Sequence, residues 1–126
     1  MKAIKCEPGK EAQIVEIPCE LEALQAAVEG YIEAFYPYDD EVAIICNEEG
    51  KINGMEPCRA IFDTDGKIID IICGPFLIVG LSPDNFASLP DDLALKYYER
   101  FKDPEFFGDE TKESGALDPW FSITMF

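Results

Sequence analysis

Four short apolar segments, each set off by a turn sequence, occupy the centre of this 126-residue chain and limit the folds open to it. They are rich in the β-branched residues that strands favour and cover residues 41–46, 59–62, 67–73 and 76–79. The sequence DTDG at residues 63–66 is typical of a hairpin turn, and Gly74-Pro75 interrupts the chain before the last segment. Short turns between neighbouring strands favour antiparallel pairing. The centre of the chain therefore predicts a mainly antiparallel sheet.

A first helix is predicted over residues 20–29, ending at Gly30. Leu21, Leu24 and Val28 recur at helical spacing, so we expect this face to turn toward the core.

A second helix is predicted to open at Ser88, which is placed to cap it, with Pro90 in the first turn. Leu93, Tyr97 and Phe101 recur every four residues and form its expected buried stripe.

The whole order of elements predicts an α+β fold. Residues 13–17 and 31–35 have strand character and add to the four central segments. We expect a mainly antiparallel sheet with two principal helices covering one face. The sequence predicts a single acidic domain over residues 1–126, with residues 107–126 peripheral and a small apolar patch at Trp120, Phe121 and Phe126.

Residue usage argues against several chemistries. The chain has no histidine, and its five cysteines are scattered without a CxxC pair, so we expect neither a zinc site nor a disulfide framework. Ser-His and Cys-His dyads are unavailable, and no phosphate-binding loop is present, although a Ser-Lys or isolated Cys mechanism stays open. We therefore expect no enzyme, no catalytic residue, no metal and no cofactor. The sequence has no apolar signal core and no run of about 20 apolar residues, so we expect a cytoplasmic protein without membrane contact.

Residues 63–68 resemble the middle of a calcium-binding EF-hand loop. Alignment on Gly66 places Ile61 and Ile72 at the first and twelfth positions, where the motif requires oxygen ligands. A hairpin turn is therefore the favoured interpretation.

Charge is the strongest functional signal. The chain has 26 acidic residues against 10 Lys and Arg, a net charge of −16, and residues 11–50 carry eleven acids and no Lys or Arg. Such a field repels nucleic acid and anionic membranes and attracts basic protein surfaces. The carboxylates that we expect to bind a partner are Glu22, Glu29, Glu33, Asp39, Asp40, Glu41, Glu48 and Glu49.

Three blocks carry a family resemblance. Residues 46–60 (CNEEGKINGMEPCRA), together with residues 70–80 and 86–89, resemble domain-of-unknown-function family 3846 over residues 13–107. The resemblance implies an accessory gene of bacteriophages, plasmids and conjugative elements, mainly of Firmicutes, and implies no established activity. In the first block Asn47, Asn53 and Arg59 are candidate binding residues. Their alternative roles are structural, with the asparagines tying local backbone and Arg59 neutralising a nearby acid.

These observations lead to two functional hypotheses. The first is an acidic accessory protein of mobile elements that occupies the basic groove of a protein partner, such as a nucleic-acid-binding host protein, as a DNA mimic of the anti-restriction or anti-CRISPR type. Because the mean surface charge density is about a quarter of that of duplex DNA, mimicry requires the carboxylates to gather on one face. The second is a small-molecule or protein-binding module whose acidity serves solubility.

Overall fold

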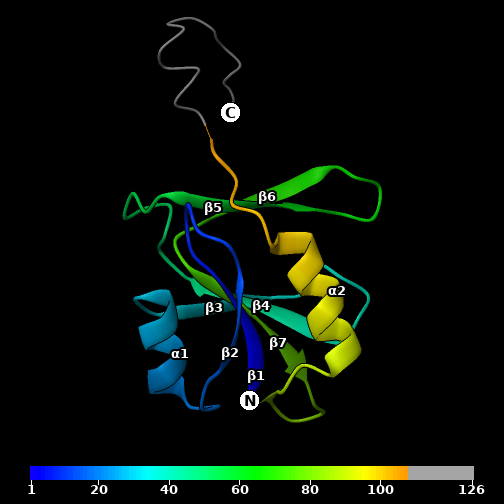
Figure 1. Cartoon of the computed structure of the whole chain (residues 1–126). Coiled ribbons are helices and arrows are strands. Elements are labelled where there is room, and N and C mark those ends of the chain that lie inside the picture. Colours follow the sequence, from blue (N-terminus) through cyan, green and yellow to red (C-terminus); the bar gives the residue numbers. More distant parts are fainter. Residues whose placement is uncertain (108–126) are drawn as a thin grey trace, which may run out of the picture.

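The computed structural model describes residues 1–107, which form two sheets and two helices (Figure 1). In chain order the elements are β1 (Lys2–Cys6), β2 (Gln13–Glu16), α1 (Leu21–Val28), β3 (Ile32–Phe35), β4 (Val42–Asn47), β5 (Pro57–Phe62), β6 (Ile68–Cys73), β7 (Phe76–Leu81), β8 (Phe86–Ala87) and α2 (Asp91–Phe101). Every strand pairing is antiparallel, which confirms the predicted α+β fold. The predicted apolar patch at Trp120, Phe121 and Phe126 lies outside the described residues.

The main sheet has the order β2-β1-β7-β4-β3, and β8 pairs with the end of β7. β7 therefore lies between β1 and β4, and its Ile78 is paired with Ile4 on one side and Ile44 on the other. All six residues of β4 and five of the six in β7 are buried. These two strands are apolar on both faces, so each face of the sheet needs a cover.

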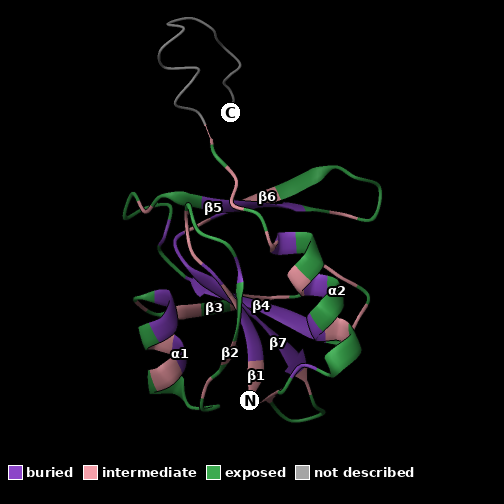
Figure 2. Cartoon of the chain, in the orientation of Figure 1, coloured by how far each residue is buried: buried purple, intermediate pink, exposed green. Residues whose placement is uncertain are grey.

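The two faces are covered by different elements (Figures 1 and 2). α1 packs on one face, where Leu24 and Val28 join Ala43, Ile45 and Leu77. α2 and the β5–β6 hairpin cover the other. The expectation that both helices cover one face is wrong, because β4 and β7 present buried side chains in both directions.

Contacts of the second helix anchor it on its face. Phe101 packs edge-to-face on Phe76, with ring centroids 5.7 Å apart, and Tyr97 is buried beside it. Ser88 is not the cap of this helix. The N-cap position is Pro90, while the Ser88 hydroxyl accepts a hydrogen bond of 2.6 Å from the backbone N–H of Lys2.

Two details of the first helix also differ from the sequence expectation. Leu21 is 57 % exposed, and the buried face is formed by Leu24, Ala27 and Val28. The helix ends at Glu29, which takes the left-handed conformation with φ of 65° in place of the expected glycine. Gly30 is required for space, because a Cβ there would lie 2.5 Å from the Asn47 side-chain nitrogen.

β1 was not predicted from the sequence. Its Lys2 and Lys5 interrupt the apolar pattern, although Ala3, Ile4 and Cys6 are buried in the sheet. Within residues 1–107, neither helix is long and apolar enough to span a membrane.

Arg59 joins three segments at the end of the sheet. Its side chain is fully buried, with Nε donating to the Phe101 carbonyl at 3.1 Å and Nη2 donating to the Lys10 carbonyl at 2.8 Å. Nη1 donates to the carbonyls of Cys58 at 3.0 Å and Glu7 at 3.4 Å. Within the described chain no carboxylate pairs with this guanidinium, so the expectation that it neutralises an acid is wrong. It instead satisfies carbonyls from the loop after β1, from β5 and from the end of α2.

Replacing Arg59 with Leu should destabilise the protein by on the order of 3 kcal/mol or more, because several buried carbonyls lose their donors. Urea unfolding measures this loss. Arg59→Lys keeps the charge but cannot reach carbonyls in all directions, so it should recover only part of the stability. A Leu variant within about 0.5 kcal/mol of wild type contradicts the role assigned to these bonds.

Candidate functional site

The loop between β4 and β5, residues 48–56, is held in place by buried contacts at its base. Asn47 is buried, and its Nδ2 donates to the carbonyls of Val28 and Glu29, both at 3.1 Å. Its Oδ1 accepts from the Glu49 N–H at 2.8 Å. Gly50 sits so close to β6 that a Cβ would lie 2.3 Å from the Cys73 carbonyl oxygen. The loop therefore has a fixed position between α1 and β6.

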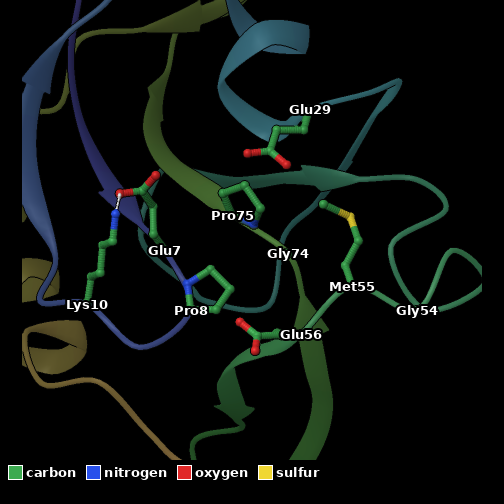
Figure 3. Close-up of a pocket in the computed structure, with 9 residues that line it drawn as sticks. All are labelled: Glu7, Pro8, Lys10, Glu29, Gly54, Met55, Glu56, Gly74 and Pro75. Atoms are coloured by element: carbon green, nitrogen blue, oxygen red, sulfur yellow. Dashed lines mark ion pairs between the residues drawn. The ribbon is translucent and has the colours of Figure 1, made fainter.

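The first hollow beside this loop has a volume of about 430 Å³. In Figure 3 the side chains of Glu7, Glu29, Met55 and Glu56 are arranged around Gly74 and Pro75. Lys10 lies at the rim and pairs with Glu7 at 3.8 Å. Glu29 and Glu56 have no such partner within residues 1–107. The walls are thus acidic, with the Met55 thioether and two prolines as apolar surface. The complete lining is Glu7, Pro8, Lys10, Glu29, Gly54, Met55, Glu56, Gly74 and Pro75.

A second hollow, of about 310 Å³, lies between the loop and β6. Glu33 and Glu48 line it from the β3–β4 side, and Asp70 lines it from β6. Asp70 pairs with Lys51 across the hollow. A third hollow, of about 270 Å³, has Glu29, Glu49 and Asn53 among its lining residues.

Five exposed carboxylates surround the loop, and we call them the acidic surface: Glu29, Glu33, Glu48, Glu49 and Glu56. None of the five lies within 4 Å of a Lys or Arg nitrogen of the described chain. Unpaired carboxylates at concave positions focus a negative field. Lys10 and Lys51 line the same hollows, but within residues 1–107 they pair with Glu7 and Asp70, so the five carboxylates can attract cations.

The structure divides the eight carboxylates predicted from the sequence. Glu29, Glu33, Glu48 and Glu49 belong to the acidic surface. The acids at 39–41 lie before β4, whereas Glu48 and Glu49 follow it, so the two groups are further apart than the about 17 Å between the first and last residues of β4 at a rise of about 3.4 Å per residue. Glu22 lies in the first turn of α1, about 10 Å along the helix axis from Glu29.

Comparison with known protein families identifies the family to which the chain belongs. The sequence model of the family described as domain of unknown function (DUF3846) matches residues 1–102. The chain is a DUF3846 protein. The match covers every strand and helix from β1 through α2 and confirms the resemblance seen in the three sequence blocks. No curated protein and no solved structure gives a significant match to the chain.

Sequence reasoning missed three carboxylates that line these hollows of the DUF3846 protein: Glu7, Glu56 and Asp70. Glu56 lies in the same loop as the candidate residue Asn53, and this position could have marked it as a candidate binding residue. Glu7 enters through the loop after β1, which was not predicted. Of the three loop candidates, Asn53 is exposed and lines the third hollow, whereas Asn47 and Arg59 are buried and bonded to backbone.

Four of the five thiols of the DUF3846 protein have pKa values raised by burial. Cys46 and Cys73 line the second hollow, where burial raises the pKa of Cys46 to about 11 and also raises the pKa of Cys73. Burial raises the pKa values of Cys6 and Cys58 to about 12. These thiols are therefore protonated near neutral pH. Within residues 1–107, no group of three or more Cys, Asp or Glu side chains is arranged to hold a metal ion.

A thiol reagent such as Ellman's should modify one cysteine rapidly in the native protein. Cys19 is exposed, whereas the other four are buried or half-buried. Cys19→Ser should abolish the fast phase, and unfolding in urea should expose all remaining thiols. Rapid modification of Cys46 or Cys73 contradicts their placement in the wall of the second hollow.

Asp40 predicts a pH dependence of stability. Its Oδ2 accepts hydrogen bonds from Lys96 Nζ at 2.6 Å and from the Tyr97 hydroxyl at 2.8 Å. These bonds, with Lys96 first, hold the pKa of Asp40 below its ordinary value of 3.8. Because the folded-state pKa is lowered, the stabilisation is complete above the unfolded-state pKa and is lost as pH falls through the folded-state pKa.

Asp40→Asn should therefore be less stable than wild type at neutral pH, and the difference should shrink below a pH of about 4. Urea unfolding of both proteins across this range measures it. Glu41→Gln removes a neighbouring exposed charge and serves as the control. Its difference in stability from wild type is not expected to shrink as the pH falls. A stability difference for Asp40→Asn that stays constant with pH contradicts the assignment.

Proposed function

We propose that this DUF3846 protein binds a protein partner through the acidic surface, which receives Lys and Arg side chains of a basic segment. The observation that supports the proposal is the grouping of five exposed carboxylates, unpaired within residues 1–107, around a loop fixed by Asn47 and Gly50. The hollows between them provide concave positions for cationic side chains.

Charge and apolar contact have separate tasks in this proposal. An exposed ion pair contributes only about 0.2–1 kcal/mol, so the carboxylates chiefly speed association and orient the partner. Met55, Pro8 and Pro75 supply apolar wall in the first hollow, and Ile52 is 84 % exposed beside the second. Burial of this surface adds affinity that salt does not screen.

The division of the carboxylates favours a short basic segment over a long groove. The acidic surface occupies one end of the β3–β4 hairpin, and Asp39 and Glu41 lie at the other. A DNA mimic of the anti-restriction or anti-CRISPR type has to engage both ends at once, because a nucleic-acid-binding groove follows many successive phosphates. The association of the family with mobile elements makes a nucleic-acid-binding host protein the first partner to test in either case.

The test compares two triple variants that remove equal charge. Glu29→Gln, Glu48→Gln and Glu56→Gln change the acidic surface, whereas Glu22→Gln, Asp39→Asn and Glu41→Gln change exposed carboxylates elsewhere. A partner is captured from host lysate with wild-type protein, and its Kd is then measured for each variant at low and high salt. We expect the first variant to lose about tenfold in affinity, from three contacts of about 0.5 kcal/mol each, and the control to lose less than about twofold.

Other outcomes separate the alternatives. Equal losses in both variants, with a steep dependence on salt, favour the DNA-mimic form of the proposal. Unchanged affinity in both variants contradicts an acidic binding surface and supports a module whose charge serves solubility.

A further inference from the structure

The β5–β6 hairpin is a two-stranded ribbon whose outer amides are bound by carboxylates. Ala60 and Ile71 are opposite one another in its register. The Ala60 N–H donates to Glu105 Oε1 at 2.9 Å, and the Ile71 N–H donates to Asp70 Oδ1 at 2.8 Å. Both N–H groups therefore point away from the ribbon, as in a non-hydrogen-bonded antiparallel pair. Each edge of the ribbon has a carboxylate where a further strand would place a carbonyl.

The two edges differ in what lies beyond them. On the β5 side, Glu105 belongs to the chain that follows α2, and this chain occupies the edge. On the β6 side, the amide is covered by the side chain of the preceding residue, Asp70, which is half-buried and pairs with Lys51 of the loop between β4 and β5. Ile69 has no partner in the register and is 50 % exposed. Within residues 1–107, β6 therefore has an edge that no strand occupies.

The open edge of β6 adjoins the second hollow. Residues Asp70, Ile71 and Cys73 line that hollow from β6, while Glu33 and Glu48 line it from the opposite side. An extended chain beside β6 would thus pass Glu33 and Glu48 as well as backbone that no strand of residues 1–107 occupies. In strand addition, main-chain hydrogen bonds give affinity and alternate side chains give specificity.

We propose that the basic segment of the partner binds in an extended conformation as a third strand along β6. This inference rests on the proposed function. A carbonyl of the segment replaces the Asp70 carboxylate at the Ile71 N–H, and a Lys or Arg side chain enters the second hollow beside Glu33 and Glu48. Apolar side chains on alternate positions cover the exposed Ile69. Gly50 lies against the Cys73 carbonyl, so the part of β6 from Ile68 to Ile72 accommodates a segment of about five residues.

The probes are three synthetic ten-residue peptides of equal net charge. The first alternates Lys and Val, the second is the same sequence with alternate backbone nitrogens methylated, and the third is a helix-forming peptide of Lys, Ala and Leu. Binding to full-length protein is followed by NMR amide shifts and hydrogen exchange at low salt. We expect the first peptide to shift the Ile69 and Ile71 amides and to slow Ile71 exchange at least about tenfold, in keeping with strand addition.

The methylated peptide and two double variants of the protein complete the test. Methylation should weaken binding at least about tenfold, because it removes the edge hydrogen bonds without changing charge. The double variant Glu33→Gln/Glu48→Gln should lose several-fold more affinity for the alternating peptide than the double variant Asp39→Asn/Glu41→Gln.

The failures of the two proposals are distinguishable. Equal binding of all three peptides, with shifts at Met55 and Glu56 and no protection of Ile71, overturns strand addition while the acidic surface keeps its proposed role. Absence of binding by every basic peptide at low salt overturns both.

Discussion

The hydrogen bonds of the buried Arg59 guanidinium are the interaction on which the end of the protein that carries the acidic surface depends. The guanidinium bonds the carbonyls of Glu7 and Lys10 on one side and that of Phe101 on the other, with β5 between them. A Lys ammonium has one charged centre and cannot span these directions, whereas the planar guanidinium donates along several. Because the loop after β1 forms one wall of the first hollow and the chain entering β5 forms another, this side chain sets the distance between them.

Much of the fold was readable from the sequence because the chemistry of its strands is local. The β-branched runs in β4, β6 and β7 and the DTDG turn predicted the central strands within one or two residues. β1 was missed because two half-buried lysines, Lys2 and Lys5, interrupt an otherwise buried strand. The placement of the helices failed for a different reason, since it depends on β7 pairing between β1 and β4, which no local pattern reveals. The continuous apolar run in β4 was nevertheless a sign of burial on both faces.

The position of the acidic surface was only partly predictable from the sequence. The excess of carboxylates over residues 11–50 indicated an acidic binding surface, and half of the residues named from it lie together. Asp40 did not remain a free carboxylate, because α2 brings Lys96 and Tyr97 to it from more than 50 residues away. Asn47 and Arg59 likewise found buried carbonyl partners on distant segments. Polar residues in a loop sequence therefore gave no indication of which of them face solvent.

The close approach of Gly50 to the Cys73 carbonyl separates what can vary in this loop from what cannot. A methyl group at position 50 meets a backbone oxygen, which cannot rotate aside, so the loop has to shift as a whole. The side chains at 48, 49, 52 and 53 extend into solvent, where exchange of size or charge meets no such obstacle. The exposed positions of this loop can thus change one at a time while its backbone keeps the same conformation, as surface loops on a rigid scaffold commonly do.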